Sequence, residues 1–165
     1  MKIGDFTIDN ESPVFIIAEL SANHNGSLDN ALATIKSAKR AGADCIKLQT
    51  YTADTLTLDS DKEDFVITGT IWEGKKYHEL YQEAYTPWEW HEALFKAAAE
   101  EGLICFSSPF DKTAVDFLET LNAPAYKIAS FEITDIPLIE YVASKGKPII
   151  LSTGIAQEED IELAL

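Results

Sequence analysis

Polar and charged residues follow five apolar stretches of the sequence, at the points where β-strands are expected to end. They include two lysines, two carboxylates, several hydroxyls, an amide and a glycine: Glu19, Lys47, Gln49, Ser107, Ser108, Lys127, Ser130, Glu132, Ser152, Thr153 and Gly154. Two ammonium groups, hydroxyls and an exposed glycine N–H group can form a cradle for an oxyanion or a phosphate. The two carboxylates can keep the lysines charged and can act as an acid or a base.

The stretch around Lys127 shows this pattern most clearly. In an extended chain, Tyr126 and Ile128 lie on one face and Lys127 lies on the other, among small residues. A lysine inside a strand is unfavourable to bury without partners, so its presence predicts a function. A single polar strand end near water would need no such explanation, but five in one chain favour a shared site.

The histidines give a weaker indication of function. His24 lies in the loop after the first predicted strand, where it either contacts a substrate or stabilises the turn. His78 and His91 have no histidine four residues away and no cysteine cluster nearby, so we interpret them as surface residues and predict no metal site. The sequence contains no dinucleotide-binding glycine motif, Walker loop or nucleophile elbow, which disfavours nucleotide binding and serine-dependent hydrolysis.

The composition is that of a globular domain with a strong negative charge. The 165 residues include 28 acidic and 13 basic side chains, for a net charge of −15. This charge disfavours nucleic acid or an anionic membrane as a partner. Cys45 and Cys105 both lie in apolar stretches and are expected to be buried, reduced thiols. With no apolar signal segment at the N-terminus, a cytoplasmic location is the expectation.

Strands and helices are predicted to alternate along the chain, after a small hairpin at residues 3–8. Apolar stretches predict five strands, at residues 13–19, 44–50 and 103–107, around Lys127, and at 147–152. Capping residues predict the helices between them, with starts at Ser27, at the capping box of Thr86 and Glu89, at Asp111, at Asp135 and at Gln157.

Two α/β architectures fit this alternation. The first is a (β/α)₈ barrel of the TIM type, of which this chain would hold roughly the first five βα units. The second is a doubly wound, five-stranded parallel sheet. Length favours the second, because a complete barrel needs about 250 residues. Strand chemistry favours the first, because polar residues end every strand, whereas an open sheet binds its ligand at one switch point.

Residues 51–85 interrupt the alternation with a long stretch that is rich in acidic and aromatic side chains. We interpret it as an insertion between the second strand and its helix, with a helical part at residues 77–85. Loops of this length are usually functional or mobile.

Five stretches of the sequence resemble the sialic acid synthase family. In order, they are FIIAELSANHNG (15–26), IKLQTY (46–51), FSSPF (106–110), AYKIAS (125–130) and ILSTG (150–154). The resemblance covers nearly the whole chain. Within this family, the loop residues 23–27 and 61–65 and Trp72 are most similar to pseudaminic acid synthases.

The resemblance implies a condensation of phosphoenolpyruvate with an N-acylated amino sugar, which gives a nine-carbon sialic-type acid and phosphate. For the subgroup, the sugar would be a 2,4-diacetamido-2,4,6-trideoxy-altrose and the product pseudaminic acid. By motif, Glu19 would face the reacting end of phosphoenolpyruvate and Glu132 would handle protons. The residues implied to hold phosphoenolpyruvate are Lys47, Lys127, Ser130, Ser152, Thr153 and Gly154. Two alternatives remain: another synthase of this kind, making N-acetylneuraminate, legionaminate or a shorter ulosonic acid, or a non-catalytic fragment that binds an anionic sugar.

The resemblance also implies parts that this sequence does not contain. A full-length family member would use a divalent metal, Mn or Mg, held by histidines on later strands, and would carry a C-terminal antifreeze-like domain within a homodimer. We therefore expect residues 1–165 to form the N-terminal portion of a barrel domain with little or no synthase activity alone. Open strand edges would favour self-association.

Overall fold

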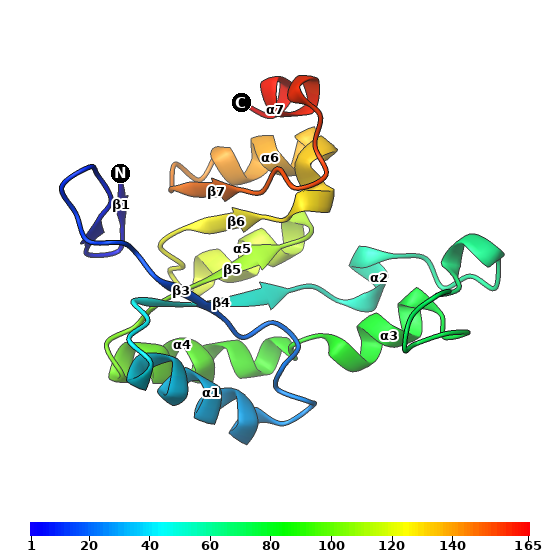
Figure 1. Ribbon diagram of the computed structural model, residues 1–165, viewed down its shortest axis with the longest axis horizontal. Helices are drawn as coiled ribbons and strands as arrows, with labels where there is room; N and C mark the ends of the chain where they lie inside the picture. Colours follow the sequence, from blue (N-terminus) through cyan, green and yellow to red (C-terminus); the bar gives the residue numbers. More distant parts are fainter.

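The computed structural model describes residues 1–165 and contains a five-stranded sheet of parallel strands (Figure 1). The strands pair in the order in which they follow one another along the chain: β3 (Ile17–Glu19), β4 (Cys45–Thr50), β5 (Ile104–Pro109), β6 (Tyr126–Ile128) and β7 (Ile149–Leu151). A doubly wound sheet reverses its strand order at a switch point, whereas a barrel adds each strand beside the previous one. The prediction of a TIM-barrel type fold with five βα units is therefore confirmed, and the sheet forms a curled half-barrel. Chain length favoured the wrong alternative.

The two faces of the sheet have separate apolar cores. On the outer face, one core joins β4 and β5 to two helices, and a second joins β6 and β7 to the next two. The helices are α1 (Leu28–Arg40), α4 (His91–Glu100), α5 (Lys112–Thr120), α6 (Ile136–Ala143) and the last one, α7 (Glu158–Ala164). Figure 1 shows α1 and α4 beside the part of the sheet that β3 and β4 form, and α6 beside β7 at the opposite edge.

The inner face is apolar only at its amino end. There Cys45, Phe106 and Ala125 pack on Ile3, which the predicted hairpin of β1 (Lys2–Ile3) and β2 (Phe6–Thr7) supplies. Both cysteines are free and buried, as predicted, and burial raises the pKa of Cys45 to about 12. No helix of the chain combines the length and apolar character that a membrane crossing requires.

Three of the predicted helix caps are present. Ser27 accepts a hydrogen bond from the N–H of Asn30, Asp111 accepts from two N–H groups of the first turn of α5, and Asp135 accepts from Leu138. Such caps satisfy N–H groups that have no partner within the helix. Because each cap follows a strand closely, it determines where the chain turns back from the carboxyl end of the sheet.

The predicted capping box at Thr86 is wrong. α4 begins at His91, after a 3₁₀ turn, η2 (Trp88–Trp90), and no side chain caps either element. The hydroxyl of Thr86 lies 3.3 Å from Nε2 of His24 instead. A buried long-range partner has replaced the local capping bond.

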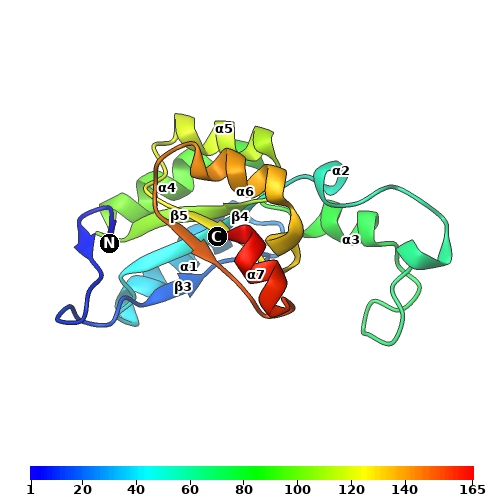
Figure 2. The ribbon, with the colours of Figure 1, turned by 90° about the horizontal axis from the view of Figure 1, so that it is seen from above.

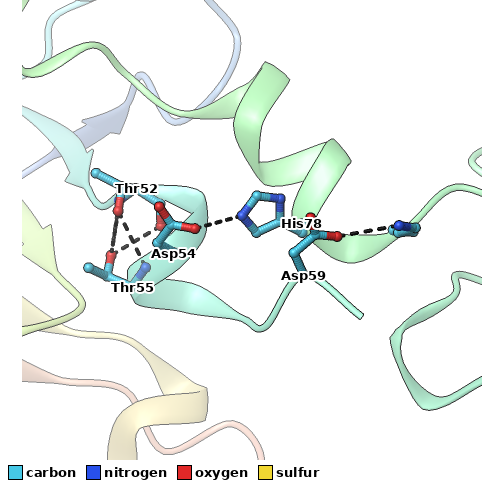
Figure 3. A network of polar contacts seen from close by, with 6 residues as sticks. Thr52, Asp54, Thr55, Asp59 and His78 are labelled. Atoms are coloured by element: carbon cyan, nitrogen blue, oxygen red, sulfur yellow. Dashed lines mark hydrogen bonds and ion pairs between the residues drawn. The ribbon is translucent and has the colours of Figure 1, made fainter. Parts of the chain in front are cut away.

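The segment between β4 and α4 projects from the carboxyl ends of the strands (Figures 1 and 2). It contains α2 (Ala53–Leu56), a 3₁₀ turn, η1 (Glu63–Phe65), and α3 (Tyr77–Ala84), which is the helix predicted at residues 77–85. Figure 3 shows how α2 and α3 are joined: Nε2 of His78 lies 2.8 Å from a carboxylate oxygen of Asp54. His78 is therefore a largely covered structural residue, not the surface residue that we predicted.

Candidate active site

Glu19 and Lys47 form an ion pair on the inner face of the half-barrel. They are partners in the register of β3 and β4, and Nζ of Lys47 lies 3.5 Å from Oε1 of Glu19. The lysine is only 7% exposed, whereas the glutamate side chain is 59% exposed. The carboxylate thus keeps contact with water while it holds a nearly buried ammonium group in place.

Lys127 approaches the same space from β6. Its Nζ donates a hydrogen bond to the carbonyl oxygen of Ile128 at 2.7 Å. Burial, and next the positive charge of Lys47, lower the pKa of Lys127, while Glu19 and Glu132 oppose this shift. Lys47, Glu19 and Glu132 all influence Lys127, and Lys47 pairs with Glu19, so the structure brings together the two lysines and two carboxylates that the sequence predicted. An anion beside both lysines would relieve the repulsion between them.

Glu132 has an unusual environment for a carboxylate. It lies in the 3₁₀ turn η3 (Ser130–Thr134) directly after β6, and its Oε2 is buried without a hydrogen-bond partner. Burial raises the pKa of this carboxyl group, with the charge of Asp135 acting in the same direction and that of Lys127 against it. A carboxyl group whose pKa is raised keeps its proton to a higher pH than an ordinary glutamate, which suits it to act as an acid.

The turn after β7 touches the turn after β6. The N–H of Ile155 donates to Oγ of Ser130 at 3.1 Å, and a Cβ atom at Gly154 would lie 3.2 Å from the same oxygen. Ser152 connects the two strands as well, because its N–H donates to the carbonyl oxygen of Ile128 at 3.1 Å. Ser130, Gly154 and the segment with Ser152 and Thr153 therefore belong to one end of the half-barrel, as expected from the sequence.

The two adjacent serines of β5 point in opposite directions. Ser108 is the register partner of Gln49, on the face that also carries Lys47. Ser107 faces the helices, and its Oγ lies 2.7 Å from Oγ1 of Thr50. Alternation along a strand allows only one of two neighbours to face the site, so the prediction that Ser107 lies there is wrong.

His91 is the third member of this buried network, and our interpretation of it as a surface residue is wrong. It is fully buried, with Nε2 lying 2.9 Å from Oγ1 of Thr50 and Nδ1 lying 3.2 Å from the carbonyl oxygen of Pro87. We assign the proton to Nδ1, because a carbonyl oxygen can only accept. Nε2 then accepts from Thr50, which in turn accepts from Ser107. The network joins the start of α4 to the two central strands.

Burial of His91 should make the protein less stable in mild acid. Burial lowers the pKa of His91 from 6.5 to about 4, so the unfolded chain binds a proton in a pH range where the folded protein does not. The stabilisation is complete above pH 6.5 and is lost as the pH falls toward 4. Between pH 7 and pH 5 we expect this group to lower the free energy of unfolding by about 2 kcal/mol.

Urea unfolding at pH 7 and pH 5 measures this effect when the protein is compared with its His91→Gln variant. The variant should be less stable at pH 7 but should lose less stability on acidification. The pKa of His24 is lowered by burial too, and its contribution cancels in the comparison. Equal losses in both proteins would contradict the prediction.

The sequence allowed His24 either to contact a substrate or to stabilise a turn, and its contacts in the structure are those of a turn-stabilising residue. It is buried, its Nδ1 accepts a hydrogen bond from the N–H of Gly26 at 3.1 Å, and its ring meets the edge of Trp90 with centroids 5.5 Å apart. With Nε2 next to Thr86, both ring nitrogens have partners in the protein. The residue therefore fastens the loop after β3 to the start of α4.

A cavity of about 560 Å³ lies beside Glu132. Gln49 and Glu132 are its only lining residues that are neither apolar nor aromatic; the others are Ala22, Tyr51, Leu56, Trp72, Leu80, Tyr81, Ala84, Phe110, Ala129 and Phe131. Its size is typical of small-molecule sites. The sequence analysis did not select these aromatic residues, although the composition of residues 51–85 indicated where they would be found.

The carboxylates, histidines and cysteines of the chain do not form a metal site, since no three of them are close enough together to hold an ion. The divalent metal that the resemblance implies therefore does not fit the residues present here, and we derive no chemical step through it.

Comparisons with known proteins agree with this geometry. The model of the NeuB family matches residues 34–165. The chain is 57% identical over 161 residues to the pseudaminic acid synthase of Campylobacter jejuni and 51% identical over 153 residues to that of Helicobacter pylori, covering 98% and 93% of this chain. It covers 46% and 45% of those relatives, and so spans about half of their length.

A solved structure has the same fold over nearly all of this chain. The N-acetylneuraminic acid (sialic acid) synthetase of Leptospira borgpetersenii, in complex with citrate, superposes with a TM-score of 0.85 at 30% identity. The match covers 99% of this chain and 53% of that one.

Proposed function

Because the chain belongs to the NeuB family, we propose that it supplies the phosphoenolpyruvate-binding part of a synthase that makes a nine-carbon sialic-type acid and releases phosphate. The observation that supports this most directly is the position of two lysines on one inner face of the half-barrel: Lys47 on β4, where it pairs with Glu19, and Lys127 on β6. Such an arrangement suits a small ligand with several negative charges. The chain is 57% and 51% identical to two pseudaminic acid synthases but 30% identical to the sialic acid synthetase. This difference favours pseudaminic acid as the product and a diacetamido-trideoxy hexose as the acceptor.

In this proposal, Lys47 and Lys127 bind the phosphate and carboxylate of phosphoenolpyruvate. Hydroxyls and the backbone N–H groups of the turn at Gly154 supply further hydrogen bonds. Groups of this kind, held in place before the reaction, need no reorganisation when charge develops in the transition state. Glu19, which pairs with Lys47, would face the reacting end of the ligand.

The proposed reaction begins when the methylene carbon of phosphoenolpyruvate attacks the aldehyde carbon of the sugar and forms a carbon–carbon bond. The aldehyde oxygen becomes a hydroxyl by taking a proton, and Glu132, whose pKa is raised by burial, is the group that we assign to donate it. Water then adds to the resulting cation at the former enol carbon and loses a proton. The tetrahedral intermediate finally breaks its bond to the phosphate oxygen, which leaves a keto acid and inorganic phosphate.

The remaining expectations form part of the same proposal. The Mn or Mg ion would be bound by residues outside 1–165, in a homodimer of the full-length protein. The free, buried cysteines favour a cytoplasmic location. Residues 1–165 alone are expected to bind phosphoenolpyruvate with little or no turnover.

Phosphate release by the intact protein tests the proposed function. With phosphoenolpyruvate and 2,4-diacetamido-2,4,6-trideoxy-altrose, we expect one phosphate per nine-carbon acid, identified by mass spectrometry. N-acetylmannosamine should be a poorer acceptor. If no N-acylated amino sugar causes phosphate release, the protein is not a synthase of this kind.

A further inference from the structure

The cavity beside Glu132 is apolar over most of its surface, with its two polar side chains on the side of the barrel. Gln49 and Glu132 provide hydrogen-bonding groups on the side of the barrel. The segment between β4 and α4 provides the opposite wall, and the side chains that reach the cavity from it are apolar or aromatic: Tyr51, Leu56, Trp72, Leu80, Tyr81 and Ala84. Apart from the hydroxyls of Tyr51 and Tyr81 and the indole N–H of Trp72, this wall offers hydrocarbon, which gains free energy from contact with methyl groups.

The apolar wall is built into the fold of this segment. The ring of Tyr51 meets the edges of both Tyr81 and Phe110, with centroid separations of 6.0 and 5.4 Å. Farther out, polar contacts join parts of the segment: Asp54 and His78 are hydrogen-bonded (Figure 3), and Lys76 forms an ion pair with Asp61 at 2.6 Å. The wall is therefore organised before a ligand arrives, which reduces the entropy lost on binding.

Neighbouring side chains of the segment differ in their position relative to the cavity. Trp72 lines the cavity and is 46% exposed, whereas Ile71 is 89% exposed and does not line it. Leu80 lines it from α3. Trp72 and Leu80 thus reach the cavity from two different parts of the segment. Ile71, next to Trp72 in the sequence, provides a matched control for substitutions.

We propose that Trp72 and Leu80 determine acceptor specificity, by packing against the acyl methyl and deoxy methyl groups of the amino sugar while its polar groups face Gln49 and Glu132. This inference rests on the proposed function and goes beyond it by assigning acceptor selection to the segment 51–85. The lysine cradle, which lies on β4 and β6, would then bind phosphoenolpyruvate independently of this wall.

Steady-state kinetics of the intact protein test the inference with two acceptors. One is the diacetamido-trideoxy hexose, and the other is a mono-N-acetyl hexosamine with a free 6-hydroxyl. For Trp72→Ala and Leu80→Ala, we expect kcat/KM for the first acceptor to fall by about 10- to 200-fold, the range for lost methylene-sized contacts in apolar pockets. The second acceptor should be affected less, and the KM for phosphoenolpyruvate should stay within about twofold. Ile71→Ala should behave as the unsubstituted protein, and Trp72→Phe should recover most of the loss.

Each other outcome has a definite meaning. Equal losses for both acceptors, a parallel rise in the KM for phosphoenolpyruvate, or an effect no larger than that of Ile71→Ala overturns the inference while the proposed function stands. Absence of turnover by the unsubstituted protein overturns the proposed function and the inference with it. Because Trp72→Phe keeps an aromatic ring, its thermal unfolding and kinetics separate a lost contact from a folding defect.

Discussion

Replacing Lys127 with methionine should lower kcat/KM for phosphoenolpyruvate by about 100- to 1,000-fold in the intact protein, the usual effect of removing one preorganised charge-stabilising group. Methionine retains most of the volume of the side chain and removes its charge. Lys47 would then face the anion alone, with Glu19 3.5 Å away competing for it. Initial rates of phosphate release at varied phosphoenolpyruvate concentrations measure the loss.

A folding defect can be separated from this loss of binding. The pKa of Lys127 is lowered chiefly by burial, so its ammonium group is held in a place that disfavours charge. Replacement by methionine is therefore expected to leave thermal stability unchanged or higher. Lys96→Met, on the exposed surface of α4, serves as the control and should retain full activity. A loss of less than about fivefold for Lys127→Met would contradict the proposed cradle, given the magnitude expected for such a group.

Replacing Glu132 with glutamine should lower kcat by about 100- to 10,000-fold, the range for loss of a general acid or base. Glutamine has nearly the same shape but no proton to donate, so the KM for phosphoenolpyruvate should change little. The pH dependence is diagnostic. Since burial raises the pKa of Glu132, the protonated form persists to higher pH than for an ordinary glutamate and is lost as the pH rises through that pKa.

The kcat of the unsubstituted protein should therefore decrease on the alkaline side of this pKa, and Glu132→Gln should lack that decrease. Glu140→Gln, on the exposed side of α6, is the matched control and should keep both the rate and the pH profile. If Glu132→Gln retains the alkaline decrease, another group donates the proton, and the assignment of Glu132 is wrong.

The two proposed binding functions lie on different parts of the fold. The cradle for phosphoenolpyruvate is formed by strands of the barrel, whose positions are determined by backbone pairing. The wall for the acceptor is formed by a segment that can vary in sequence without disturbing that pairing. A change of acceptor would then require substitutions between residues 51 and 85 and none at Lys47 or Lys127.

The sequence alone was sufficient to predict three helix caps and the faces of β4, because these depend on contacts within a few residues. Ser27, Asp111 and Asp135 cap helices because their side chains reach N–H groups within three residues. Alternation along β4 likewise predicted that Lys47 and Gln49 share a face. The pattern of polar strand ends also indicated a barrel, because such a fold brings the carboxyl ends of its strands to one mouth.

Tertiary structure decided which of several local possibilities was realised. The strand order excluded a doubly wound sheet, and it depends on pairing between segments far apart in the sequence. Ser107 faces the helices because Thr50, 57 residues away, completes a buried network there. Thr86 contacts His24, 62 residues away, instead of capping a helix. For Ser107 and Thr86, a buried hydroxyl is satisfied by a distant partner, and leaving it unsatisfied would cost more than a local bond contributes.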